Sequence, residues 1–271
     1  MKFAICNEIF HGWNLDDTLA AAARFGFDGL EIAPFTLAPA VTDISAADRD
    51  RMRAAAARHG IEIAGLHWVL VKPEGLHVNH PDLAIRQRTA RYFCDLVDFC
   101  ADLGGTRMVV GSPKQRNVQP GVSPDQARRW ALDTFRPAVA QAEARRVTIC
   151  FEPLSPAETN FINTAAQAIE FVSELPSPSF QIILDVKAMC SESKPIPQII
   201  RESWPHFAHF HANDRNFKGP GFGDVDFVPI AAALKEVGYD GFVSVEVFKF
   251  DEGPEAIATR SVEYLKRIFG G

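Results

Sequence analysis

The 271-residue sequence has little of several features that mark specialised classes of protein. Lysine and arginine (28) are outnumbered by aspartate and glutamate (34), and the resulting net charge of −6 argues against a nucleic-acid partner. The five cysteines are an odd number, and no two of them form a CxxC pair. This argues against a disulfide framework and against a zinc ribbon, so we expect reduced and mostly buried thiols.

Long apolar runs are also missing, and no segment approaches the ~20 residues that a membrane helix requires. Glu8 introduces an acid before any apolar stretch long enough for a secretion signal. The 18 Gly and 18 Pro are too few for a collagen-like or low-complexity chain, while 47% hydrophobic residues suffice for a large core. We therefore expect a soluble, cytoplasmic protein with no membrane partner, and the composition permits a homo-oligomer without requiring one.

Short apolar segments alternate with longer segments rich in Ala, Leu and Arg along the whole chain. The short segments predict strands at residues 3–6, 29–32, 61–66, 107–110, 147–151, 181–184, 207–210 and 242–245. The longer segments predict helices at residues 15–24, 46–58, 83–103, 124–145, 165–175, 196–203, 228–237 and 255–268. Asn14, Ser45, Ser123 and Asn163 are the expected N-caps, and Gly26, Gly60, Gly104 and Gly238 the expected helix ends.

Eight strand–helix units fit the length of the chain at about 34 residues per unit. Continuous apolar strands separated by helices indicate a parallel sheet that is covered by helices. No linker or change of composition divides the sequence. We predict an α/β fold, a single-domain (β/α)8 TIM barrel over residues 1–271, with a doubly wound open sheet as the alternative.

Four successive predicted strands are each followed by a side chain that can bind a metal: Glu152, Asp185, His211 and Glu246. Because the working face of a barrel is built at the C-terminal ends of its strands, these four groups are expected to converge. Three carboxylates held together repel one another unless a cation neutralises them. Carboxylates with one imidazole suit Mn²⁺ or Mg²⁺ best, and Co²⁺ or Zn²⁺ are alternatives. The pattern predicts one divalent metal ion.

The same four residues, with Gly241–Glu246 closing the set, resemble the xylose-isomerase-like TIM-barrel superfamily. Within it the chain is most similar to sugar (phosphate) isomerases and epimerases of the tagatose/psicose 3-epimerase and hydroxypyruvate isomerase kind. The likeness covers nearly the whole chain, including residues 26–31, 65–68, 111–113, 152–158 and 211–227. It implies a divalent metal and two glutamates, Glu152 and Glu246, that both ligate it and transfer protons. Glu158 matches a position that contacts substrate hydroxyls in the family.

The chain departs from the ketose 3-epimerases at two positions that hold substrate oxygens in those enzymes. Ala188 stands where they carry a histidine, and Phe217 stands where they carry an arginine. Lys187 and Arg215, together with Lys218, are candidates for binding a carboxylate or phosphate of the substrate instead.

Other polar residues near the predicted strand ends are weaker candidates. His67, at the end of the third strand, is expected to reach a substrate hydroxyl. Glu31 is expected to be a salt-bridge partner, and His209 shares a strand face with His211 and is expected to lie behind it. The long segment from Trp68 to residue 82 suggests a lid.

The leading hypothesis is a divalent-metal-dependent isomerase or epimerase acting on a small sugar, sugar phosphate or hydroxy-keto acid. Proton transfer between Glu152, Glu246 and the carbon beside a carbonyl would proceed through an enediolate. A dehydratase or lyase of the inosose dehydratase kind could use the same chemistry to expel a hydroxyl. An endonuclease-IV-like DNA repair nuclease is the remaining alternative, although it would need additional histidines and a surface suited to DNA.

Overall fold

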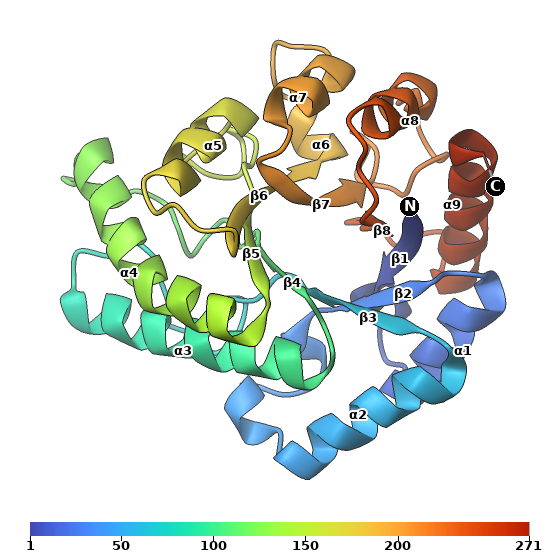
Figure 1. The fold of residues 1–271 in the computed structure, drawn as a ribbon, viewed down its shortest axis with the longest axis horizontal. Coiled ribbons are helices and arrows are strands. Elements are labelled where there is room, and N and C mark those ends of the chain that lie inside the picture. Colours follow the sequence, from blue (N-terminus) through green and yellow to red (C-terminus); the bar gives the residue numbers. More distant parts are fainter. Residues whose placement is uncertain (271) are drawn as a thin grey trace.

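The computed structural model describes residues 1–270, so Gly271, the last residue of the predicted single domain, lies outside the described residues. Eight parallel strands pair in sequence order and β8 pairs with β1, which closes the barrel (Figure 1). The strands are β1 (Lys2–Cys6), β2 (Gly29–Ile32), β3 (Glu62–Leu66), β4 (Arg107–Val110), β5 (Thr148–Phe151), β6 (Phe180–Asp185), β7 (Phe207–Ala212) and β8 (Phe242–Val245). The predicted TIM barrel is confirmed, and closure excludes the open sheet.

Helices surround the barrel as an outer layer (Figure 1). They are α1 (Leu15–Phe25), α2 (Ala46–His59), α3 (Leu83–Asp102), α4 (Pro124–Arg145), α5 (Ala165–Ser173), α6 (Val186–Met189), α7 (Ile196–Ser203), α8 (Phe227–Glu236) and α9 (Pro254–Phe269). Every predicted helix and strand is present with boundaries within two residues of the expectation. The short helix α6 and three 3₁₀ helices, at Asn7–Phe10, Pro34–Thr36 and Val41–Asp43, were not predicted.

Local capping chemistry sets most of the helix boundaries. The side chains of Asn14, Ser45 and Ser123 accept hydrogen bonds from the first turns of α1, α2 and α4, as predicted. The cap expected at Asn163 was wrong by one residue, because Thr164 accepts the hydrogen bond from the first turn of α5. The side chain of Asn163 instead donates to the carbonyl oxygens of Leu154 and Thr159.

The hydrophobic core lies between the barrel and the helical layer and accounts for the abundance of phenylalanine. Phe135 of α4 packs against Phe93 and Phe180 at ring-centroid distances of 4.9 and 5.2 Å. Phe171 of α5 packs against Phe151 of β5 at 4.8 Å. These contacts fix helices α3 to α5 against the strands that carry two of the predicted metal ligands.

Two further expectations concern the membrane and the cysteines. Within residues 1–270 no helix has the length and apolar character needed to cross a membrane. All five cysteines are free, and Cys6, Cys100 and Cys150 are buried while Cys94 and Cys190 are partly buried.

Candidate metal centre and active site

The four predicted metal-binding side chains meet at the C-terminal end of the barrel. Glu152 and Glu246 directly follow β5 and β8, Asp185 ends β6, and His211 is the penultimate residue of β7. One ligand atom from each residue lies within 4.8 Å of the others, and all four residues are buried. The pairing of consecutive strands from β5 to β8 therefore brings together four groups that are spread over 94 positions of sequence.

Glu152 occupies space that the neighbouring strand leaves free. A Cβ atom at Gly111, just after β4, would lie 1.8 Å from Oε2 of Glu152, so only glycine leaves room for this carboxylate. Burial and the negative charges of Glu246 and Asp185 raise the pKa of Glu152 well above its usual range. Glu152 is thus a carboxyl group that readily holds a proton while no cation is bound.

Asp185 is oriented by the short helix that follows it. Its Oδ1 accepts a hydrogen bond of 2.7 Å from the backbone of Ala188, which makes Asp185 the N-cap of α6. Its Oδ2 accepts a bond of 2.5 Å from Nδ2 of Asn213, whose own Oδ1 accepts one from the backbone of Lys187. Asn213 is fully buried, and sequence reasoning assigned it no role although it follows His211 by two residues, the period of a strand.

His211 lies between two carboxylates. Its Nδ1 is 3.2 Å from Oε2 of Glu246, and its Nε2 is 3.2 Å from both oxygens of Glu31. Burial opposes protonation of the ring, but Glu31 and Glu246 outweigh it and raise the pKa of His211 well above its usual value. The Nδ1 side faces the carboxylate cluster, whereas Glu31 fixes the ring from behind.

Glu31 was expected to form a salt bridge, and in the structure it contacts two histidines of the site. It is fully buried at the end of β2 and accepts a hydrogen bond of 2.9 Å from Nε2 of His209 as well as those from His211. Burial alone would raise the pKa of Glu31, but the two imidazoles hold it well below its usual range. A carboxylate behind a histidine ligand is a recurrent arrangement at metal sites because it sets the tautomer and orientation of the ring.

The donor set and its charge fit a divalent cation. Three carboxylates converge with one imidazole and no thiolate, which favours Mn²⁺, Mg²⁺ and related ions over a structural zinc site. Burial, together with the repulsion between the carboxylates, raises the pKa values of Glu152 and Asp185. A bound cation would relieve that repulsion, so the residues fit the metal that the sequence pattern predicts.

His67 and Trp68, directly after β3, lie beside the cluster. The buried ring of His67 is 2.7 Å from Glu8 through Nε2, and its pKa is raised because Glu8 outweighs the effect of burial. Trp68 has a left-handed backbone with φ of +51°. Its indole Nε1 donates a 2.9 Å hydrogen bond to Oε1 of Glu246, so the indole ring reaches across from β3 to the end of β8.

The basic residues that were candidates for binding an anion are not gathered at the site. Nζ of Lys187 forms a 2.6 Å ion pair with Glu158, which also accepts a hydrogen bond from Ser155. Lys218 pairs with Glu252. Arg215 instead lines a groove between the α6–α7 region and the start of α8. The structure therefore brings Lys187 and Glu158 together as a neutral pair and leaves Arg215 apart.

The long segment after β3 packs on the loop that follows β4. Val78 donates its backbone N–H to Gln115, and Nδ2 of Asn79 donates to the carbonyl of Arg116. The buried guanidinium of Arg116 donates to the backbone oxygen of Glu152 at 2.5 Å and lies 4.8 Å from the ring centroid of Phe151. The segment expected to be a lid is therefore hydrogen-bonded to the support of Glu152.

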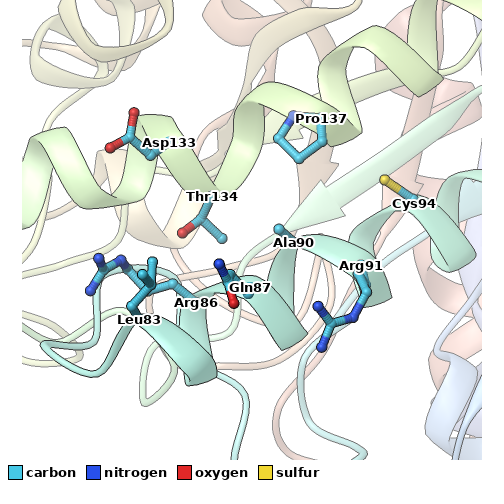
Figure 2. Close-up of a pocket in the computed structure, with 9 residues that line it drawn as sticks. All are labelled: Leu83, Arg86, Gln87, Ala90, Arg91, Cys94, Asp133, Thr134 and Pro137. Carbon is cyan, nitrogen blue, oxygen red and sulfur yellow. The ribbon is translucent and has the colours of Figure 1, made fainter.

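One hollow on the surface lies away from this chemistry. It has a volume of about 430 Å³ between α3 and α4 and is lined by residues such as Arg86, Arg91, Asp133 and Thr134 (Figure 2). Both helices belong to the outer layer (Figure 1), whereas the four residues of the carboxylate cluster lie at the strand ends. This groove has no part in the candidate site.

Comparison with known sequences and structures agrees with the geometry. The sequence model described as xylose isomerase-like TIM barrel matches residues 19–268. Similar proteins include D-psicose 3-epimerase of Ruminiclostridium cellulolyticum, which is 28% identical over 83% of this chain and 75% of its own length. L-ribulose 3-epimerase of Mesorhizobium japonicum is 29% identical over 91% and 80%. 3-Dehydro-D-guloside 4-epimerase of Escherichia coli is 25% identical over 98% and 99%.

Solved structures of related enzymes share the fold over the whole chain. A D-psicose 3-epimerase from Clostridium cellulolyticum H10 with D-tagatose superposes with a TM-score of 0.88 and 23% identity over 99% of both chains. A 3-keto-D-glucoside 4-epimerase from E. coli gives 0.86 and 22% identity over 98% and 99%. The relatives named here are sugar epimerases, which confirms the predicted class of enzyme.

Proposed function

Because the chain belongs to the xylose isomerase-like TIM-barrel family, we propose that it is a divalent-metal-dependent epimerase of a keto sugar. The observation that carries this proposal is the convergence of Glu152, Asp185, His211 and Glu246 within 4.8 Å at the C-terminal end of the barrel. The 3- and 4-epimerase names of the relatives support epimerisation over dehydration. Mn²⁺ or Mg²⁺ is the proposed ion, and Co²⁺ or Zn²⁺ also suits the donors.

In this proposal Glu152, Asp185, His211 and Glu246 hold the ion. A divalent cation at this position would stabilise negative charge on the sugar oxygens beside the carbon that loses its proton. Glu152 and Glu246 come from strands β5 and β8, which lie apart around the barrel with β6 and β7 between them. Their carboxylates are thus placed to approach a substrate carbon from two sides, one removing a proton and the other returning one.

The pKa values of the two glutamates are shifted in opposite directions, which suits one of them to remove a proton and the other to return one. Burial raises the pKa of Glu246, but the charge and hydrogen bond of His211 more than compensate and lower it below the usual range. The pKa of Glu152 is raised by burial and by its acidic neighbours. In the metal-free protein Glu246 is therefore held as a carboxylate, the form that accepts a proton, and Glu152 is held closer to its protonated form, so we assign Glu246 as the base and Glu152 as the acid of the pair.

Supporting residues are proposed to bind or orient the substrate. His67 is buried beside the cluster and is proposed to reach a substrate hydroxyl, as are Glu158 and its partner Lys187. Because Glu158 neutralises Lys187 and Arg215 lies in a separate groove, the site favours an uncharged sugar over a phosphate or carboxylate. Arg215 would contact only a substrate that extends beyond the cluster.

The nuclease alternative is disfavoured by the same geometry. Its chemistry needs further histidine ligands, but His67 pairs with Glu8 and His209 with Glu31. A solved structure named AP endonuclease, family 2 from Brucella melitensis has a TM-score of 0.75 at 18% identity, which reflects the shared fold.

Solvent exchange provides the test of the proposed function. The Mn²⁺-loaded protein in D₂O should incorporate deuterium at the carbon beside the carbonyl of its substrate, and Glu246→Gln should lower the rate at least ~100-fold. Glu263→Gln, at an exposed position of α9, is the matched control. Failure of the wild type to exchange with free ketoses, ketose phosphates, hydroxy-keto acids and keto-glycosides would overturn the proposal, and a dehydrated product would replace it with the lyase.

A further inference from the structure

Four partly exposed aromatic side chains form a row across the mouth of the barrel. The row consists of Phe35 after β2, Trp68 after β3, Phe248 after β8 and Phe217 in the loop after β7. Successive ring centroids are separated by 6.4 Å from Phe35 to Trp68, 6.0 Å to Phe248 and 6.3 Å to Phe217. We call these four residues the aromatic row.

The aromatic row is continuous with the reacting centre. Trp68 donates its indole N–H to Glu246, and Nζ of Lys187 lies 3.9 Å from the ring centroid of Phe248. Lys187 covers that part of Phe248, so the open surface of the row is provided mainly by Phe35, Trp68 and Phe217. A substrate held at the metal cluster would therefore have aromatic surface beside it.

Phe217 lies at one end of the row, and both its exposure to solvent and its backbone conformation are unfavourable for a phenylalanine. Its side chain is 43% exposed and its backbone is left-handed, with φ of +72°. Hydrogen bonds fix this conformation, because Phe217 donates its N–H to Asp214 and its carbonyl oxygen accepts from Phe248 and Lys249. The loop thus holds a large apolar ring in solvent at one end of the row.

The apolar faces of the aromatic row and the few cations beside it favour a sugar ring as the ligand. The amphipathic C–H face of a sugar ring packs on an aromatic ring, and the cations next to the row are Lys187, which is already paired with Glu158, and the exposed Lys249. The row extends from β2 and β3 on one side of the barrel mouth to β7 and β8 on the other. The row therefore continues on both sides of Trp68, the member that contacts Glu246, through centroid separations of 6.0 to 6.4 Å.

We propose that the aromatic row binds a second sugar ring, so that the substrate is a keto sugar carrying another glycosyl unit. This inference rests on the proposed function for the identity of the reacting ring, and it assigns Phe217 to the specificity for the second ring. The stacking of that ring on Phe217 supplies affinity that a free ketose lacks.

Ketoses with and without a second ring test the proposal directly. Lactulose and isomaltulose each carry a second ring on a fructose unit, and fructose is the one-ring reference. Binding is measured by calorimetry and by quenching of tryptophan fluorescence, with Trp68→Phe to assign the signal. The wild type should bind at least one disaccharide about tenfold more tightly than fructose. Phe217→Ala should reduce this ratio to near one.

Phe250→Ala is the matched control, because Phe250 is 44% exposed in the loop after β8 and lies outside the aromatic row. It should preserve the preference for the disaccharide. Equal affinity of the wild type for fructose and both disaccharides, absence of binding by all three, or an equal loss of preference in Phe250→Ala would overturn the proposal. Deuterium exchange is recorded separately, so binding of a disaccharide through Phe217 together with no exchange in any tested substrate would overturn the proposed function and leave the second-ring site standing.

Discussion

At the scale of single residues, Glu31 shows how much of the site depends on groups behind the metal ligands. Its two oxygens hold both rings of His209 and His211, and all three side chains are buried. From the sequence we expected only a salt bridge at this position, because no local motif indicates which side chains a glutamate at the end of a strand will contact. The contact with two histidines from a strand on the far side of the barrel requires closure of the sheet.

Replacement of Glu31 by Gln should weaken metal binding without changing any direct ligand. The amide removes the negative charge that fixes His211, and we expect the affinity for Mn²⁺ to fall about 10- to 100-fold. Calorimetric titration of the metal-free protein measures this change. Glu62→Gln, at an exposed glutamate that pairs with Lys2, is the control. An unchanged affinity for Mn²⁺ in Glu31→Gln would show that the negative charge of Glu31 does not contribute to metal binding through His211.

At the scale of elements, the segment between β3 and α3 is an ordered support of the site. His77 donates its backbone N–H to Thr89, and Val78 is hydrogen-bonded to Gln115 and, through its carbonyl, to Thr134. The sequence identified this segment as unusually long, which suggested a lid. Its buried apolar residues, among them Val69, Leu70 and Val78, belong to the hydrophobic core.

The same segment should make stability depend on pH. Burial, with a smaller effect of His80, lowers the pKa of His77 to about 4. The unfolded chain binds this proton near pH 6.5 and the folded protein does not, so stability is full above pH 6.5 and falls as the pH drops toward 4. With solvent screening we expect a loss of about 1–2 kcal/mol.

Urea unfolding of the metal-free protein at pH 7 and pH 5 measures this loss. His77→Gln should reduce the difference in unfolding free energy between the two pH values. The exposed histidine variant His11→Gln serves as the control. The same pH dependence in wild type and His77→Gln would refute the assignment.

At the scale of the whole molecule, the proposed metal centre would link four strands of one closed sheet. Its ligands come from β7 and from the ends of β5, β6 and β8, and β8 pairs with β1 at the start of the chain. A cation at the cluster would therefore stabilise the folded barrel as a unit. We propose that residues 1–271 form one cooperative domain, as the sequence predicts.

Metal binding should accordingly raise the unfolding temperature in a single transition. Free Mn²⁺ at about 100 times its Kd should add ~2.7 kcal/mol to the free energy of unfolding. Calorimetric scans of the chelated and Mn²⁺-loaded proteins measure this increase, and Asp185→Asn should lose most of it. Two separated transitions would contradict the single domain, while an unfolding temperature unaffected by divalent ions would contradict the metal site.

The sequence by itself determined the barrel and the convergence of four polar residues at the C-terminal ends of its strands. Repeated apolar segments have local periodicity and recognisable caps, and residues that directly follow strands share one edge of a parallel sheet. These signals depend on neighbours in the chain, so Glu152, Asp185, His211 and Glu246 could be predicted from sequence.

Only the tertiary structure decided the contacts between distant segments. Glu31 meets His209 and His211 across 178 and 180 positions, and Trp68 reaches Glu246 across 178. The separation of Arg215 from Lys187 and the alignment of the aromatic row likewise depend on loop paths. Such contacts arise from the closure of the barrel and from side-chain packing, for which no local pattern in the sequence exists.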